Sequence, residues 1–240
     1  MKTKIYKAND RGTANHGWLK TNFSFNFAHY YNPEKINFGA LRVLNDDYIQ
    51  GGMGFGTHPH ENMEIISIPL KGALKHRDSM SNKWIPLSTG EVQVMSAGTG
   101  IQHSEMNNHP IEEVNLFQIW IIPNQQQVKP RYNQKVFNVL ERKNKLQVLV
   151  SSIEDKIEGA LTIHQNAQIS RIDLSENSVF KYQLKSENNG VYLMVIEGKI
   201  TVDTNDLSNR DAVSIEQTSN FEIKVAKNAE LLFIEVPLKF

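Results

Sequence analysis

The chain has 240 residues, with 26 basic and 26 acidic side chains and a formal net charge of zero. This balance provides no basic field of the kind that attracts nucleic acids or anionic membranes, so neither is an expected partner. The chain contains no cysteine, which excludes disulfides, thiolate nucleophiles and cysteine-bound metals. With no apolar leader at its start and no apolar run near the ~18 residues of a membrane span, the sequence predicts a soluble, cytoplasmic protein.

Short segments rich in Val, Ile, Phe and Tyr recur along the chain, separated by Gly, Asn, Asp and Pro. The segments are 38–44, 64–68, 92–95, 116–122, 146–150, 160–164, 169–174, 180–184, 191–196, 199–202, 221–225 and 231–236. Apolar and polar residues alternate in many of them, and turn residues stand between them, which is typical of β-sandwiches and barrels. No long segment with a helical period competes, so the sequence predicts an all-β fold.

A polar stretch divides the predicted strands into two groups. The apolar run 116–122 ends at Pro123, and residues 124–130 that follow are unsuited to the interior of a sheet. An apolar strand, a glycine turn and a returning strand occur near Gly72 and again near Gly198, as a duplicated barrel would give. We therefore expect two domains, residues 1–135 and 136–240.

Two short segments of the first half hold a set of metal-ligand side chains. His58 and His60 are two residues apart, and so are His103 and Glu105. Residues i and i+2 of a strand face the same side, so two such strands lying together would place three imidazoles and one carboxylate around one point. This nitrogen and oxygen set suits a divalent first-row metal. A site of this kind leaves coordination positions open, which indicates a catalytic rather than a structural metal.

Nothing in the spacing of the remaining histidines demands a place in the site, and we interpret them as ordinary surface or core residues. They are His16, His29, His76, His109 and His164. For His76 and His109, a second interpretation stays open, namely that they line the mouth of the site. Since His164 is the only histidine of the second half, no metal is expected there.

Glu64 is the competing carboxylate for the metal. It follows His60 in a segment that resembles the first cupin motif, where the glutamate is commonly a ligand. On a straight strand it would lie about 13 Å from His60, so it would need a turn at 61–63 to reach the metal. Glu105 needs no turn. We expect Glu105 to be the fourth ligand and Glu64 to support the ligands from behind.

Several segments of the first half resemble the pirin family, and in particular the bacterial pirin-like quercetin 2,3-dioxygenases. These segments are 10–19, 23–25, 41–47, 57–60, 76–79 and 95–105. The resemblance implies a bicupin fold of two packed jelly-roll barrels, with one metal in the first barrel on His58, His60, His103 and Glu105. The second half resembles the family only in its strand pattern, and its implied role is to pack on the first barrel and cover apolar surface.

The resemblance also implies an activity. It implies a dioxygenase that opens the ring of a flavonol such as quercetin with O2 and releases carbon monoxide. The implied metal is Fe(II), although Cu, Ni, Mn, Zn or Cd could occupy the same donor set in preparations. Glu105 is the nearest base for the proton of the substrate's 3-hydroxyl. The candidates for an apolar mouth are Phe55, Met95, Met106 and Trp120. We expect the chain to be a monomer.

Two other functions stay open. One is a regulatory binding protein whose metal senses redox state while the surface contacts a transcription factor. The other is a cupin isomerase that uses its metal only as a Lewis acid. A large exposed apolar or charged patch would favour the first, and activity without O2 would identify the second.

Overall fold

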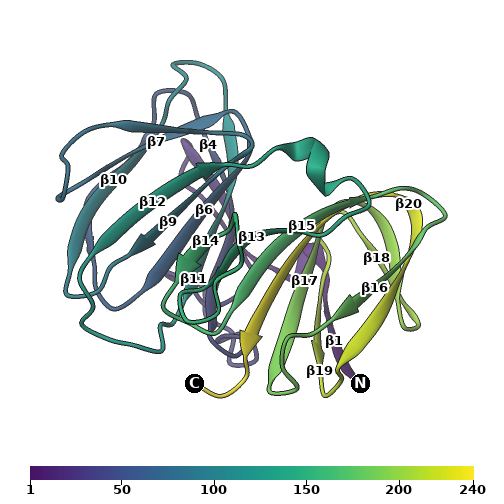
Figure 1. Cartoon of the computed structure of the whole chain (residues 1–240). Helices are drawn as coiled ribbons and strands as arrows, with labels where there is room; N and C mark the ends of the chain where they lie inside the picture. Colours follow the sequence, from purple (N-terminus) through teal and green to yellow (C-terminus); the bar gives the residue numbers. More distant parts are fainter.

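The computed structural model describes all 240 residues as two β-barrels that lie side by side (Figure 1). The elements of the first half are β1 (Lys2–Tyr6), η1 (Ala8–Asp10), β2 (Gly12–Asn15), β3 (Leu19–Phe23), β4 (Leu41–Ile49), β5 (Gly54–His60), β6 (Glu64–Lys71), β7 (Ala73–Asp78), β8 (Ile85–Ser88), β9 (Glu91–Ser96), β10 (Ile101–Asn107), β11 (Val114–Ile121) and β12 (Arg131–Val136). Those of the second half are η2 (Val139–Arg142), β13 (Gln147–Ser152), β14 (Leu161–Ile163), β15 (Gln168–Leu174), β16 (Val179–Gln183), β17 (Asn189–Val202), β18 (Asn205–Ser208), β19 (Ala212–Glu216) and β20 (Asn220–Pro237). The only helices are two short 3-10 turns, which confirms the all-β prediction, and no helix could cross a membrane.

The first barrel is built from two sheets and the second from one large sheet. A seven-stranded sheet has the order β12-β9-β6-β11-β4-β3-β2, and a four-stranded sheet has the order β5-β10-β7-β8. The second barrel is formed by a nine-stranded sheet with the path β1-β19-β17-β20-β15-β13-β14. Strand β1 pairs with β19, so the beginning of the chain is added to the second barrel. A division at 135/136 stays our proposal for the domains, with β1 as the strand that crosses.

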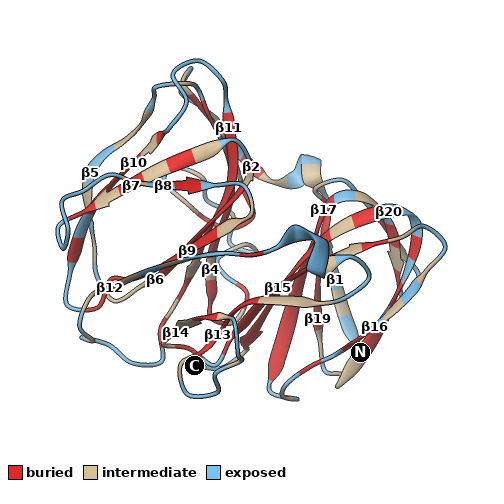
Figure 2. Ribbon diagram, turned by 45° about the horizontal axis from the view of Figure 1, so that its top comes forward, coloured by how far each residue is buried: buried red, intermediate tan, exposed pale blue.

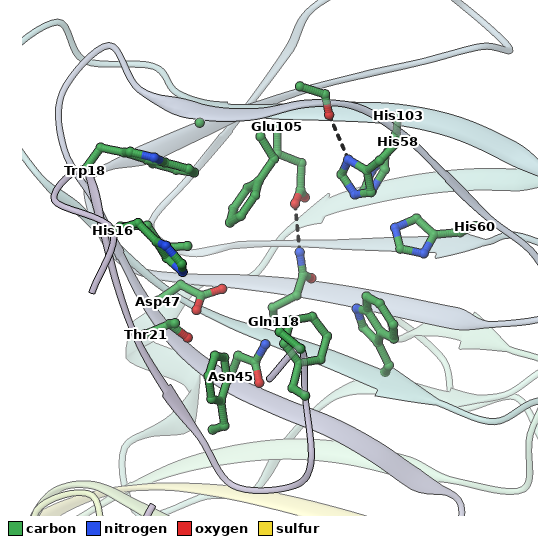
Figure 3. A pocket seen from close by; sticks show the side chains of 18 of the residues that line it. His16, Trp18, Thr21, Asn45, Asp47, His58, His60, His103, Glu105 and Gln118 are labelled. Atoms are coloured by element: carbon green, nitrogen blue, oxygen red, sulfur yellow. Dashed lines mark hydrogen bonds between the residues drawn. The ribbon is translucent and has the colours of Figure 1, made fainter. Parts of the chain in front are cut away.

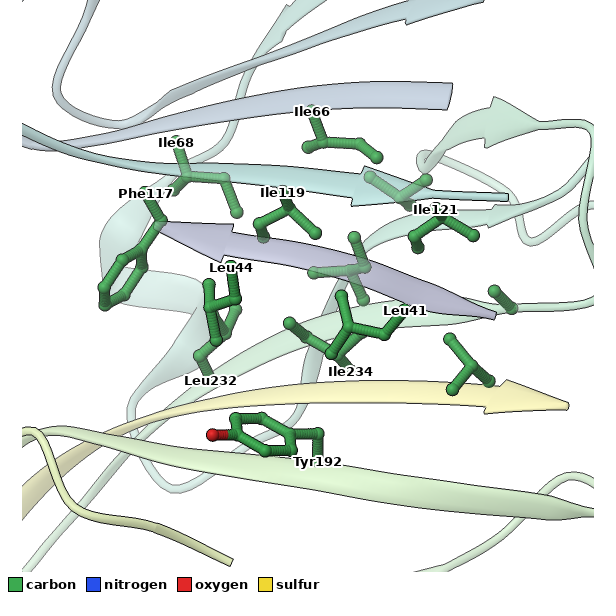
Figure 4. Packing of buried hydrophobic residues seen from close by; sticks show 14 of the residues in the cluster. Leu41, Leu44, Ile66, Ile68, Phe117, Ile119, Ile121, Tyr192, Leu232 and Ile234 are labelled. Carbon is green, nitrogen blue, oxygen red and sulfur yellow. The ribbon is translucent and has the colours of Figure 1, made fainter. Parts of the chain in front are cut away.

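The largest apolar cluster lies between the two barrels. Alternation along the strands turns Ile66 of β6 and Ile119 of β11 away from the interior of the first barrel, toward Leu232 and Ile234 of β20 and Tyr192 of β17 (Figure 4). The cluster has 27 buried residues, drawn from both halves of the chain. Each barrel therefore covers an apolar face of the other, as the resemblance implied for the second half.

The interiors of the two barrels differ. The second barrel is filled by a cluster of 18 buried apolar residues, including Leu193 and Phe233. The first barrel has only clusters of six and four such residues, with polar side chains between them. Figure 2 shows the contrast at the strands: β17 is mostly buried, whereas β5 has no buried residue. The open interior belongs to the first barrel.

Truncation of Ile119 tests the packing between the barrels. Its side chain is completely buried in the shared cluster, so Ile119→Ala is expected to lower the free energy of unfolding by about 2–5 kcal/mol. Chemical denaturation measures this. Leu140→Ala is the control, because Leu140 is 79% exposed and its loss should change stability by about 0.5 kcal/mol or less. Equal effects of the two variants would contradict the assigned packing.

Candidate metal centre

The fold brings the three predicted histidine ligands together. Strands β5 and β10 are antiparallel neighbours, and His58 lies directly opposite His103 in their register. Their Nε2 atoms are 2.9 Å apart. The ring nitrogens of His58, His60 and His103 all lie within 4.8 Å of one another. The i, i+2 spacing on β5 and the register with β10 thus create one cluster of nitrogen donors.

The protonation state of this cluster fits a metal. Burial, and then the neighbouring His58, lower the pKa of His103 to about 2 and that of His60 to about 4. Both imidazoles are therefore neutral near pH 7 and present a lone pair, the form that binds metals. Together with the nearby ring nitrogens of His58, they form a donor group whose spacing fits a divalent first-row ion.

Glu105 lies in the same cavity but is held by other side chains. Gln118 Nε2 donates to its Oε2 at 2.8 Å, and Ser67 Oγ donates to its Oε1 at 3.3 Å. Burial raises its pKa, opposed chiefly by His76 and His58. Its carboxylate belongs to a second close group, with His76 and His103, rather than to the group of three histidines. Its role as fourth ligand therefore stays a proposal.

His76 is a residue of the site that the sequence did not place there. It is completely buried on β7, opposite Glu105 of β10, whereas we expected at most a position at the mouth. Its Nδ1 is 3.4 Å from Nδ1 of His103, and its Nε2 is 3.0 Å from Oδ2 of Asp78. The pattern His76-x-Asp78 has the same i, i+2 spacing as the ligand pairs, and that signal would have identified it.

The expectation for Glu64 is wrong. Glu64 alternates with Ile65 on β6 and so faces the second barrel rather than the interior of the first. There it accepts a hydrogen bond of 2.7 Å from Ser96 Oγ, and burial raises its pKa to about 7 against the effects of Ser96 and Arg131. The chain does turn between His60 and Glu64, at Asn62 with φ of 46°, but the turn does not bring Glu64 to the histidines.

Two of the four candidates for the apolar mouth line the cavity, and two do not. Phe55 and Trp120 are wall residues. Met95 is buried in a separate small apolar cluster, and Met106 alternates with Glu105 on β10 and faces away. His16 also lines the cavity, which its isolated position in the sequence did not indicate.

The comparisons with known proteins agree with this geometry. Residues 5–121 match the family described as Pirin, and residues 148–236 match the one described as Quercetinase C-terminal cupin domain. A protein of Escherichia coli (strain K12) named quercetin 2,3-dioxygenase is 41% identical over 233 residues, which cover 97% of this chain and 98% of that protein. The chain belongs to the pirin family.

Solved pirin structures have the same fold as this pirin-family chain. The crystal structure of YhhW from Escherichia coli covers 98% of both chains with a TM-score of 0.92 and 38% identity. The same protein in complex with nickel(II) gives a TM-score of 0.91 and 38% identity, with 98% of this chain and 99% of that chain covered. These findings confirm the resemblance to pirins and the bicupin fold.

The pirin site opens into a cavity of about 550 Å³. Most of its lining surface is apolar, and the aromatic side chains on it are Trp18, Phe23, Phe27, Phe55 and Trp120. Figure 3 shows His58, His60 and His103 along one side, with Glu105 and Gln118 beside them. A concave, mostly apolar cavity with a few convergent polar groups is the usual form of a small-molecule site.

Contacts behind the three histidines determine which ring nitrogen of His103 carries the proton. If Nε2 of His103 binds the metal, its Nδ1 carries the proton and donates to Nδ1 of His76. His76 then carries its own proton on Nε2 and donates to Asp78. Asp78 Oδ1 also accepts hydrogen bonds from the backbone N–H groups of Met80 and Ser81, which hold the carboxylate in place.

Asp78→Asn tests this chain of contacts. An amide is a weaker acceptor than a carboxylate, so His76 is held less firmly and His103 loses the preference for a proton on Nδ1. Metal affinity is therefore expected to fall about 10–100-fold. Competition with a chromophoric chelator measures the affinity. Asp155→Asn, at an exposed carboxylate of the second barrel, is the matched control and should leave affinity unchanged. An unchanged affinity in Asp78→Asn would separate Asp78 from the metal.

Proposed function

We propose that this pirin-family chain is a metal-dependent dioxygenase that opens the ring of a flavonol such as quercetin with O2 and releases carbon monoxide. The observation that carries the proposal is the position of three imidazoles and one carboxylate on a cavity of about 550 Å³ that Phe and Trp side chains line. Relatives named quercetin 2,3-dioxygenase, at 41% identity over nearly the whole chain, support the choice of reaction.

His58, His60, His103 and Glu105 would hold one metal ion per chain, and we propose Fe(II). The bound ion would lower the pKa of the substrate's 3-hydroxyl and would assist electron transfer from the substrate to O2. The donor set has no cysteine and accepts several divalent ions, so the metal is set by availability as well as by geometry. The nickel(II) complex of a relative agrees with this tolerance.

The side chains of the cavity supply proton transfer and binding. Glu105 takes the proton of the 3-hydroxyl, because its carboxylate lines the cavity beside His103. Gln118 and Ser67 hold its two oxygens during the transfer. Trp18 and Phe55, whose rings meet edge to face at 5.2 Å, exclude water and bind the flat faces of the substrate.

The deciding experiment combines metal analysis with turnover. The protein is purified without a histidine tag, its metal content is measured, and quercetin is supplied with and without O2. We expect loss of quercetin absorbance and release of carbon monoxide only with O2. Turnover without O2 would indicate a Lewis-acid isomerase. A metal-loaded protein that turns over no flavonol under either condition would contradict the proposal and favour a regulatory binding protein.

A further inference from the structure

The cavity has a second polar region, away from the histidines. It comes from β3 and β4, where Asp47 lies directly opposite Thr21, and Asn45 lies opposite Gln118 of β11. Thr21, Asn45 and Asp47 all line the cavity. Figure 3 shows them grouped with His16 on one side, while His58, His60 and His103 lie on the other. A flat molecule bound at the metal would reach this region with its far end.

These side chains are buried, and the amide of Asn45 is not fully paired. Asn45 and Asp47 are 3% and 5% exposed. Oδ1 of Asn45 has no hydrogen-bond partner. Buried polar groups are almost always paired, because an unpaired one loses its hydration without compensation. Asn45 lines the cavity with an amide that is not fully paired, which suits a ligand that offers hydrogen-bonding groups.

The contrast with the neighbouring residue supports this. Asp46 alternates with Asp47, faces out of the barrel and binds two guanidinium groups, Arg11 at 3.2 Å and Arg210 at 3.6 Å. Asp47 has no cationic partner. Burial raises the pKa of Asp47 to about 7, opposed by the Thr21 hydroxyl. Near neutral pH its carboxyl can both donate to and accept from a hydroxyl group.

We infer that Asn45 and Asp47, with Thr21, form the subsite that recognises hydroxyl groups on the ring of the substrate that lies away from the metal. The inference rests on the proposed function and names its substrate class, namely aromatic compounds hydroxylated at both ends. Phenolic hydroxyl groups would pair with the Asn45 amide and with the Asp47 carboxyl. Sites built to pair with a substrate hydroxyl discriminate strongly against analogues without it, because the buried protein groups are then left unpaired.

The test uses three flavonols that carry two, one or no hydroxyl groups on the pendant ring. With the wild-type protein we expect KM to rise about 10–100-fold from the first to the last, with kcat changed much less. Asn45→Leu and Asp47→Leu should remove this dependence by weakening only the hydroxylated substrates. Tyr48→Phe is the control on the same strand, because Tyr48 faces away from the cavity and the dependence should remain.

A second measurement distinguishes a role of Asp47 in substrate recognition from a role in stabilising the fold. Removing a buried carboxyl that has no cationic partner should leave the melting temperature of Asp47→Leu equal to or above that of the wild type, whereas a structural role predicts a lower one. If no flavonol is turned over, the proposed activity fails, but binding of the three compounds to nickel-loaded protein, followed by absorbance, still decides the inference. Equal affinity for the three flavonols, or none, would overturn it, as would variants that keep the wild-type preference.

Discussion

Replacement of His103 by alanine is expected to abolish metal retention, whereas replacement of His164 should leave it unchanged. His103 is the central residue of the site, because its Nε2 lies 2.9 Å from His58 and its Nδ1 lies 3.4 Å from His76. Its replacement removes one of the proposed ligands, and it is the residue that both groups of possible donors share. His164 follows β14 in the second barrel and belongs to neither donor group.

Both variants are loaded with Fe(II) under anaerobic conditions and passed through a desalting column, and metal content is measured by mass spectrometry. We expect less than about one tenth of the wild-type content in His103→Ala, since a ligand contributes a large share of the affinity of such a site. Circular dichroism checks that the variant is folded. Equal metal loss in the two variants would contradict the single site in the first barrel.

The sequence predicted the ligand pairs because strand geometry is local. A period of two places His58 with His60 and His103 with Glu105 on one face, whatever the rest of the fold does. The pairing of β5 with β10 is not local, and the shift in their register between His103 and Glu105 could not be predicted. That shift accompanies the separation of Glu105 from the group of three histidines.

The sequence could not say which face of each strand lines the interior of the first barrel. On β6 both faces are buried: Ile66 lies in the cluster between the barrels, and Ser67 lies inside the first barrel. A strand buried on both sides reads as a nearly continuous apolar run, so its direction is hidden. For this reason the orientation of Glu64 was mistaken, whereas the all-β class was predictable.

One signal for the interior was present in the sequence. Four buried polar residues lie within strands, and the register aligns them in one row across the seven-stranded sheet, in the order Asn45, Gln118, Ser67 and Gln93. Gln118 and Ser67 hold Glu105, and Gln93 Nε2 lies 3.4 Å from His76. A polar residue at the middle of an apolar strand therefore marks the face that surrounds the site in this barrel.

Replacement of Glu105 by glutamine is expected to separate its two proposed roles. If the carboxylate only holds the metal, Glu105→Gln should lose metal and activity together, because a neutral amide is a poorer ligand. If it also takes the substrate proton, the metal-saturated variant should bind a flavonol yet turn over about 10²–10⁴-fold more slowly. The side chain keeps its size, so the volume of the cavity changes little. The side chain also stays within reach of Ser67 and Gln118.

The assay measures kcat at saturating metal, flavonol binding by its absorbance shift, and metal content on the same samples. Glu61→Gln is the matched control, since Glu61 is an exposed carboxylate next to His60 that contacts Gln127 and Asn62 rather than the cavity. It should retain wild-type metal content and kcat. A metal-saturated Glu105→Gln with wild-type kcat would remove Glu105 from proton transfer, and the metal on its three histidines would then have to acidify the substrate hydroxyl without help from a base.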